Sequence, residues 1–157
     1  MFYRRVSIEQ SYFAEYEKKL DVKRMIALTL QSTVETLHQL IDRDWSKLDQ
    51  AELEAMRETV ESLSNRLLSE IDHTDNLNHL VEAINYEITH FFLPIRCVIK
   101  IYQRLIWLNP TNPSYYEWFT DYLLQYGPDW QEEANGLTEL YTKEDFQSAC
   151  DFVQKIE

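Results

Sequence analysis

Two Glu-x-x-His pairs are the residues in this chain whose types and spacing come closest to a catalytic pattern. They are Glu35 with His38 and Glu87 with His90. Residues three apart lie on the same face of a helix. In four-helix di-iron proteins this spacing supplies inward-facing metal ligands, which two further glutamates on other helices complete. The pairs therefore raise the hypothesis of a di-metal four-helix-bundle oxidase.

The expected helix faces argue against that hypothesis. If Val34 and Leu37 face the core, Glu35 points mostly outward, and if Ile88 faces the core, His90 turns away from it. The chain also has no His-Glu-x-x-His motif, no glycine-rich phosphate loop and no Gly-x-Ser-x-Gly elbow. We therefore expect a protein that is not an enzyme and that has no metal and no cofactor.

The composition indicates a folded, acidic protein. The 157 residues are 45% hydrophobic and 13% aromatic, which predicts one globular domain spanning residues 1–157. There are 27 acidic and 15 basic side chains, for a formal charge of −12. Because nucleic acids and anionic lipids are polyanions, this charge disfavours both as direct partners. It favours a basic protein surface, although acidity also simply promotes solubility.

The cysteines and the N-terminal segment predict a cytoplasmic location. Cys97 and Cys150 lie in apolar, helix-like surroundings without paired spacing, so we expect two buried free thiols in a reducing compartment. Arg4 and Arg5 are not followed by the apolar run of a signal peptide. No segment approaches the roughly 20 apolar residues that a membrane span requires.

The first part of the chain predicts a long antiparallel helical hairpin over residues 7–72. Ser7 and Gln10 form a capping box for a helix that extends to about Arg43, and Asp49 and Glu52 form a second box. The hydrophobic stripe of this hairpin has heptad spacing, interrupted by one lysine, so it also permits a homodimer. The stripe comprises Phe13, Tyr16, Leu20, Lys23, Ala27, Leu30, Val34, Leu37 and Ile41, then Leu53, Met56, Val60, Leu63 and Leu67.

Residues 74–157 predict an array of shorter helices, which makes the fold all-α with about seven helices. Pro94 separates the third helix, whose apolar face includes Ile88, from the fourth. The later helices are expected to start at capping residues and to stop at glycine. The predicted caps are Ser114 with Glu117, Asp129 with Glu132, and Thr142 with Asp145, and the predicted stop is Gly127.

Residues 98–127 resemble one corner of the tetratricopeptide repeat, in which a proline-terminated helix is followed closely by another helix. Asn109-Pro110 closes the first helix, and Gly127 matches the loop glycine. The proline does not recur one 34-residue period away, where Asn76 and Glu144 stand instead. The resemblance implies an array of helix pairs that binds a protein or peptide. Its packing positions are Tyr102, Leu105, Leu108, Tyr116 and Phe119, with Asp129 in the turn.

Aromatic and acidic residues gather around the same corner. Nine aromatic residues occur from Tyr102 to Trp130, more than one amphipathic face can bury, unless a neighbouring helix covers both sides of the predicted helix 114–126. From Leu105 to the end there are ten acidic and two basic residues, whereas the first 104 residues hold 17 and 13. Exposed tyrosine and tryptophan are preferred interface anchors.

We therefore predict a non-enzymatic interaction module, such as an adaptor, scaffold or assembly factor, that binds a basic protein. The alternative is an acidic inhibitor, either an immunity protein against a toxin or a mimic of nucleic acid. The predicted contact surface lies near residues 107–133. Its aromatic anchors are Trp107, Tyr115, Trp118, Tyr122 and Trp130, and its charge partners are Asp121, Glu132 and Glu133.

Overall fold

The computed structural model describes residues 30–125 and 128–157, and these are entirely helical apart from their connections. Seven α-helices occur in them, which confirms the predicted all-α fold, and no strand is found there. The first helix is described over residues 30–41. It is followed by η1 (Trp45–Lys47), α2 (Gln50–His73), α3 (Leu77–His90), α4 (Ile95–Leu108), α5 (Pro113–Gln125), η2 (Pro128–Trp130), α6 (Gln131–Thr142) and α7 (Phe146–Gln154).

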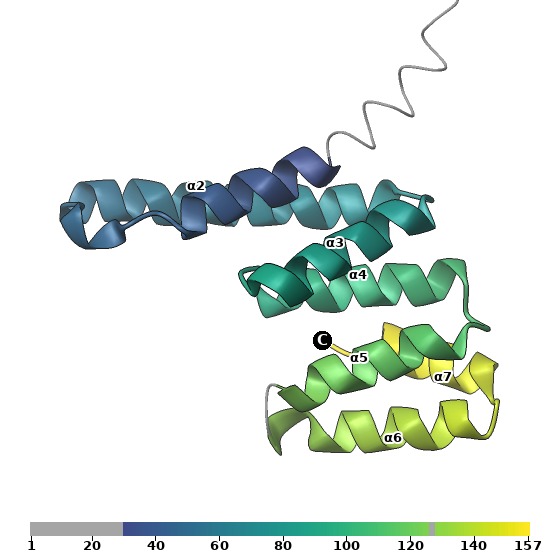
Figure 1. The fold of residues 1–157 in the computed structure, drawn as a ribbon. Coiled ribbons are helices and arrows are strands. Elements are labelled where there is room, and N and C mark those ends of the chain that lie inside the picture. Colours follow the sequence, from purple (N-terminus) through teal and green to yellow (C-terminus); the bar gives the residue numbers. More distant parts are fainter. Residues whose placement is uncertain (1–29, 126–127) are drawn as a thin grey trace, which may run out of the picture.

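The helices form stacked layers (Figure 1). Helix 30–41 and α2 lie antiparallel in the first layer, and their connected ends extend beyond the rest of the molecule. The next layer contains α3 and α4, and the last contains α5, α6 and α7. Because α4 packs against α2, α3, α5 and α7, it is the central helix of the fold.

The hairpin of helix 30–41 and α2 has the predicted register. Leu30, Val34 and Leu37 are buried, as the heptad stripe requires. Asp49 caps α2 by accepting a hydrogen bond from the backbone N–H of Glu52 at 2.8 Å. The turn between the helices contains η1, where the Trp45 indole N–H donates to the Leu40 carbonyl at 2.8 Å.

A polar contact fastens the two helices of the hairpin together. The Glu70 carboxylate on α2 accepts from the Thr33 hydroxyl at 3.0 Å and from Arg66 Nε at 2.9 Å. Partial burial raises the pKa of Glu70, although both hydrogen bonds oppose that shift. The carboxylate therefore positions helix 30–41 on α2 at some cost in desolvation.

The inward face of α3 differs from the predicted one. Ile88 was expected in the core, but its side chain is 59% exposed, whereas Glu87 beside it is buried. The reason lies at the end of the helix, where Phe91 adopts a left-handed conformation with φ of 52°. This reversal aims the next two backbone N–H groups at Glu87 Oε2, which accepts from Phe92 at 3.1 Å and from Leu93 at 2.8 Å. The Glu87 carboxylate therefore holds the turn that follows α3.

Three ion pairs join α4 to α2 and to the loop that follows α2. Arg104 also donates from Nε to the Thr74 carbonyl at 3.0 Å, so its guanidinium binds two groups on the same loop. We call this interface the α2–α4 seam. Its pairs are Arg96–Glu61 at 2.9 Å, Lys100–Asp72 at 3.2 Å and Arg104–Asp75 at 2.8 Å.

An aromatic core holds α5, α6 and α7 against α4. Phe119 stacks on Tyr102 with ring centroids 5.0 Å apart. Tyr116 stacks on Tyr141 and Phe146, and its hydroxyl donates to the Pro110 carbonyl at 2.5 Å. Tyr102, Tyr116 and Phe119 are at most 1% exposed, so this core is fully closed to solvent.

The C-terminal helices are also tied to α4 by buried amides. Gln103 Nε2 donates to the carbonyls of Val153 and Ile156 at 2.9 and 2.7 Å, and Gln154 Nε2 donates to the Gln103 carbonyl at 2.9 Å. At the crossing of α6 and α7, a Cβ atom added to Gly136 would lie 3.0 Å from the Phe152 ring. The two helices approach closely because residue 136 has no side chain.

The predicted helix caps were only partly correct. Asp145 alone caps α7, by accepting from the Ser148 N–H at 3.3 Å, whereas Thr142 is the last residue of α6. The cap of α5 is Asn112 rather than Ser114, since Asn112 Oδ1 accepts from the Ser114 N–H at 3.0 Å. Asp129 does not cap α6, because it lies within η2, and Trp130, which precedes α6, makes no side-chain capping bond.

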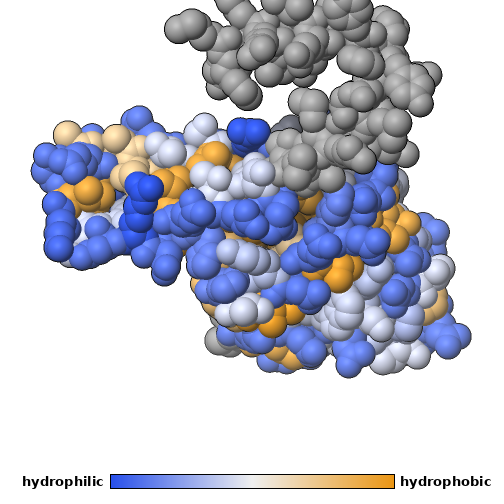
Figure 2. All heavy atoms as spheres, turned by 45° about the horizontal axis from the view of Figure 1, so that its top comes forward, coloured by the Kyte–Doolittle hydropathy of each residue, from blue (hydrophilic) through white to orange (hydrophobic). Residues whose placement is uncertain are grey.

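Several predictions fall outside the described residues. These include the capping box of Ser7 and Gln10, the stripe from Phe13 to Ala27 with its Lys23 interruption, and the stop at Gly127. Within the described part of the chain, no helix has the length and apolar composition of a membrane span. On the face shown in Figure 2, hydrophilic residues cover most of the described surface and hydrophobic ones form small separate patches.

Candidate protein-binding surface

Trp107 is the most exposed aromatic side chain that sequence reasoning assigned to the surface. It lies in the last turn of α4, where its side chain is 58% exposed, although both preceding residues, Leu105 and Ile106, are fully buried. The indole forms a wall shared by two shallow pockets. An exposed indole between two hollows is a typical anchor for a protein partner.

The first of these pockets has a volume of about 300 Å³ and lies between the α4–α5 corner and α7. Its walls are largely apolar, with a single carboxylate, that of Asp151. The Asp151 side chain is exposed, and its only hydrogen bonds are long contacts of 3.4 Å from the Gln147 amide on the preceding turn. The lining residues are Trp107, Pro110, Thr111, Phe146, Gln147, Cys150 and Asp151.

The second pocket, of about 310 Å³, lies on the other side of the Trp107 indole and borders the α2–α4 seam. Lys100, Asp72 and Arg104 line it, and all three are engaged in the ion pairs of the seam. Gln103 and Gln154 complete it. Because its charges are already matched, this pocket offers a partner less net electrostatic attraction than the Asp151 pocket.

The aromatic anchors predicted on α5 do not share one environment. Trp118 is 39% exposed, but Tyr115 and Tyr122 are only 8% and 5% exposed. Tyr122 packs against Tyr102 on α4, and Tyr115 packs beneath Trp118 with centroids 5.5 Å apart. The placement of Tyr115 and Tyr122 on the contact surface was therefore wrong, because neighbouring elements cover both sides of α5.

The remaining predicted residues are on η2, α5 and α6. Asp121 and Glu132 are exposed, whereas Trp130 is half-buried and packs against the core. Glu133 is also half-buried, and its Oε2 atom is buried without a hydrogen-bond partner. No ring contact joins Trp107 to Trp118 in the described residues, so the predicted residues that remain exposed do not form one compact cluster.

The acidic residues of the last three helices are mostly unpaired. Over the described residues from 105 onward, the only ion pair is Lys143–Glu139 at 3.1 Å, and both side chains are 68% exposed. Asp145 caps α7, and Asp151 contacts only an amide. Among the described residues, Asp121 and Glu132 therefore have no cationic partner, and the excess of acidic side chains produces a negative potential over α5, α6 and α7.

The two Glu-x-x-His pairs meet in the fold but do not form a metal centre. The His38 and His90 rings lie 4.6 Å apart, and His38 Nδ1 is 2.6 Å from the Tyr86 hydroxyl. Glu35, however, is exposed and accepts from the Gln31 amide, while Glu87 accepts from two backbone N–H groups in the turn after α3. Among the described residues, no group of three or more histidine, cysteine, aspartate or glutamate side chains could hold a metal ion.

Burial shifts the pKa values of Glu87 and of the two cysteines. Burial raises the pKa of Glu87, because two hydrogen bonds from backbone N–H groups only partly offset the loss of hydration. Burial raises the pKa of Cys97 to about 11 and also raises that of Cys150. Both thiols are free and buried, as predicted, and their high pKa values disfavour the nucleophilic thiolate.

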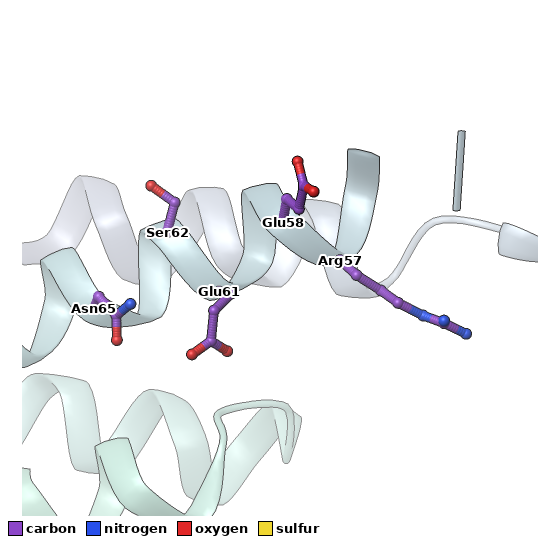
Figure 3. A pocket seen from close by; sticks show the side chains of 5 residues that line it. All are labelled: Arg57, Glu58, Glu61, Ser62 and Asn65. Atoms are coloured by element: carbon purple, nitrogen blue, oxygen red, sulfur yellow. The ribbon is translucent and has the colours of Figure 1, made fainter. Parts of the chain in front are cut away.

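A third hollow, of about 610 Å³, lies along α2 near the projecting part of the hairpin. Figure 3 shows that all its labelled side chains come from this one helix, with Glu61 and Asn65 pointing toward the next layer. Glu61 is already paired with Arg96, and the hollow is wide open. Its lining residues are all polar or charged, whereas a binding pocket usually has hydrophobic and aromatic side chains as well.

Sequence reasoning missed Phe146, Cys150 and Asp151 as part of a surface with Trp107. These residues lie about forty positions after Trp107, and only the packing of α7 against α4 brings them together. A weak signal was present, since Phe146 and Cys150 are four apart and Asp151 falls beside their apolar stripe.

Comparisons of the chain with protein-family models, curated proteins and solved structures gave no match.

Proposed function

We propose that this protein is a non-enzymatic interaction module that binds a basic protein through α5, α6 and α7. The observation that carries the proposal is the charge imbalance of this region, where ten acidic and two basic residues from 105 onward make only one ion pair among the described residues. Like charges left unpaired on a folded surface disfavour the compact state. A basic partner surface would neutralise them, which supports such a surface as the natural complement.

Exposed aromatic side chains on α5 and at the end of the neighbouring helix α4 support the proposal. Trp107 and Trp118 are 58% and 39% exposed, and tryptophan is among the residues that contribute most binding energy when a partner buries it. The likeness of the α4–α5 corner to a tetratricopeptide corner is consistent with an adaptor or scaffold role. In this proposal the acids accelerate and orient association, while the indoles supply apolar contact area.

The proposal is tested by reversing charge on the acidic surface and, separately, on the hairpin. The test variant carries Asp121→Lys and Glu132→Lys, both at exposed positions. The matched control carries Glu54→Lys and Glu58→Lys at exposed positions of α2, so both variants gain the same charge. Tagged proteins are incubated with lysate of the native cell, and captured proteins are quantified by mass spectrometry.

We expect the test variant to capture at least about tenfold less of the basic partner than the unmodified protein does, while the hairpin control captures the same amount. Raising the salt concentration should weaken binding of the unmodified protein, because exposed charges are screened. Retention by the test variant and loss by the control would contradict the proposal. So would a captured partner that is not basic.

A competition experiment with the captured partner distinguishes an adaptor from an acidic inhibitor. An inhibitor that imitates nucleic acid would compete with DNA or RNA for one surface of its target, since both are polyanions. An adaptor would leave nucleic-acid binding by the partner unchanged. A filter-binding competition assay with the purified partner separates the two, and the charge imbalance alone favours neither.

A further inference from the structure

We propose that the pocket between Trp107 and Asp151 receives an arginine side chain of the basic partner. This inference rests on the proposed function and specifies which group of the partner is recognised and where. It follows from three features of the pocket: an exposed aromatic face, a carboxylate without a cationic partner, and largely apolar walls. A guanidinium group matches all three, because it is planar, permanently charged and weakly hydrated.

The aromatic wall fits a planar cation. Trp107 is 58% exposed in a helix whose core-facing residues are buried, so its ring remains accessible to a ligand. A cation over the face of tryptophan is attracted by the ring quadrupole, and tryptophan is the most favourable aromatic partner. The Pro110 and Phe146 side chains, which also line the pocket, can contact the methylene groups of the arginine stem.

The carboxylate fits the charged end of the same side chain. Asp151 is exposed on α7, and its contacts with the Gln147 amide, at 3.4 Å, are too long to satisfy it. Arginine binds carboxylates with two parallel N–H donors, which a lysine ammonium cannot reproduce. The pocket therefore favours arginine over lysine, although both carry a positive charge.

No basic side chain of the described residues occupies the pocket. Lysine and arginine are absent from Leu105 to Thr142, and neither is among the residues that line it. The neighbouring pocket across the indole differs in its charges, because Lys100 and Arg104 line it and already pair with aspartates. One side of Trp107 is thus electrostatically balanced, and the other has a carboxylate without a cationic partner.

The inference is tested by NMR titration of the full chain with two pentapeptides. One is Gly-Gly-Arg-Gly-Gly with blocked ends, and the other replaces arginine with citrulline, its neutral isostere. We expect the arginine peptide to shift the Trp107 indole N–H resonance saturably in the millimolar range, and the citrulline peptide to leave it unchanged. Equal shifts with both peptides would overturn the inference, because the charge would then play no part.

Two pairs of variants place the binding at this pocket. Asp151→Asn should weaken the arginine peptide about threefold or more, whereas Asp121→Asn, which removes one charge from exposed α5, should not. Followed through the backbone amide resonance of Cys150, which lines the pocket, Trp107→Leu should abolish binding of the arginine peptide, whereas Trp118→Leu, at the other exposed indole, should leave it intact. Unchanged affinity in Asp151→Asn would contradict the proposal, and so would equal losses in both aspartate variants.

Binding of the basic partner to two double variants then tests this inference separately from the proposed function on which it rests. If Trp107→Leu with Asp151→Asn loses the partner, the pocket is part of the interface. If that double variant binds normally while Asp121→Lys with Glu132→Lys does not, the arginine pocket is wrong and the acidic surface stands. Normal binding by both double variants contradicts both proposals.

Discussion

Charged side chains between α2 and α4 are paired across the interface, whereas those on α5, α6 and α7 are mostly left to solvent. The α2–α4 seam contains three ion pairs, and Arg104 adds a bond to a backbone carbonyl. The last three helices have one ion pair within the described residues, and it lies within a single helix. In the seam ion pairs connect different elements, but among the described residues of the last three helices no ion pair does.

The cores of the two regions differ as well. The hairpin buries aliphatic side chains such as Val34, Leu37 and Leu67, while the last helices are joined by stacked rings. Large aromatic side chains bury much area for each residue, so a few of them can hold short helices together. This core allows the C-terminal region to tolerate a repulsive acidic surface, which we interpret as a functional property.

The largest effect should come from the aromatic core. Phe119→Ala should lower the free energy of unfolding by about 3–5 kcal/mol, because a fully buried ring leaves a cavity. Trp118→Ala, one residue earlier on the same helix but 39% exposed, should cost roughly 1 kcal/mol or less. Urea denaturation of the two variants checks the difference. Similar losses would mean that Trp118 belongs to the core and is not available to a partner.

A smaller effect is expected at Glu87, a buried carboxylate that makes no ion pair with lysine or arginine among the described residues. Glu87→Ala should cost about 1–3 kcal/mol, because the N–H groups of Phe92 and Leu93 lose their acceptor. Glu82→Ala, at an exposed position of the same helix, is the control and should change stability little. Equal denaturation midpoints for both variants would show that water satisfies these N–H groups.

The two kinds of ion pair can be compared directly. Arg104→Ala should cost about 1–2 kcal/mol, because a half-buried guanidinium loses both Asp75 and the Thr74 carbonyl. Lys143→Ala removes an exposed pair within α6 and should cost below about 0.5 kcal/mol. Thermal unfolding at low and high salt measures both. If Lys143→Ala were the more damaging change, the contrast between the regions would fail.

The smallest effect concerns pH. Burial raises the pKa of Glu87 above its ordinary value of 4.5, so the folded state holds this proton more tightly than the unfolded state. The contribution of Glu87 to stability should therefore increase as the pH falls from neutral, and reach its full value below 4.5. Glu87→Gln cannot titrate, so its unfolding free energy should rise less steeply on acidification. Parallel pH profiles would contradict a raised pKa.

Much of the fold could be predicted because local patterns determine it. The heptad stripe placed Leu30, Val34 and Leu37 in the core, and the Asp49 cap marked the start of α2. Ile88 was misplaced because periodicity alone could not show that Phe91 reverses the chain and draws Glu87 inward. A buried carboxylate that binds the turn after its own helix depends on backbone geometry, which apolar spacing does not encode.

The candidate site was harder to predict than the fold. Exposure of Trp107 and Trp118 agrees with the prediction, but Tyr115 and Tyr122 were assigned to the surface although the packing of other helices covers them. Sequence spacing gives the sides of one helix, but it does not say how many sides have neighbours. For the same reason, Asp151 could not be associated with Trp107 before α7 was placed against α4.

The close approach of α6 and α7 has an evolutionary consequence. Gly136 leaves room for the Phe152 ring, so a methyl group at position 136 would strike that ring at about 3 Å. A larger residue at 136 requires the Phe152 ring to move aside or a smaller residue to replace it, so the order of the two changes matters. Among descendants of this chain, the two positions should vary together, with the smaller residue at 152 appearing first.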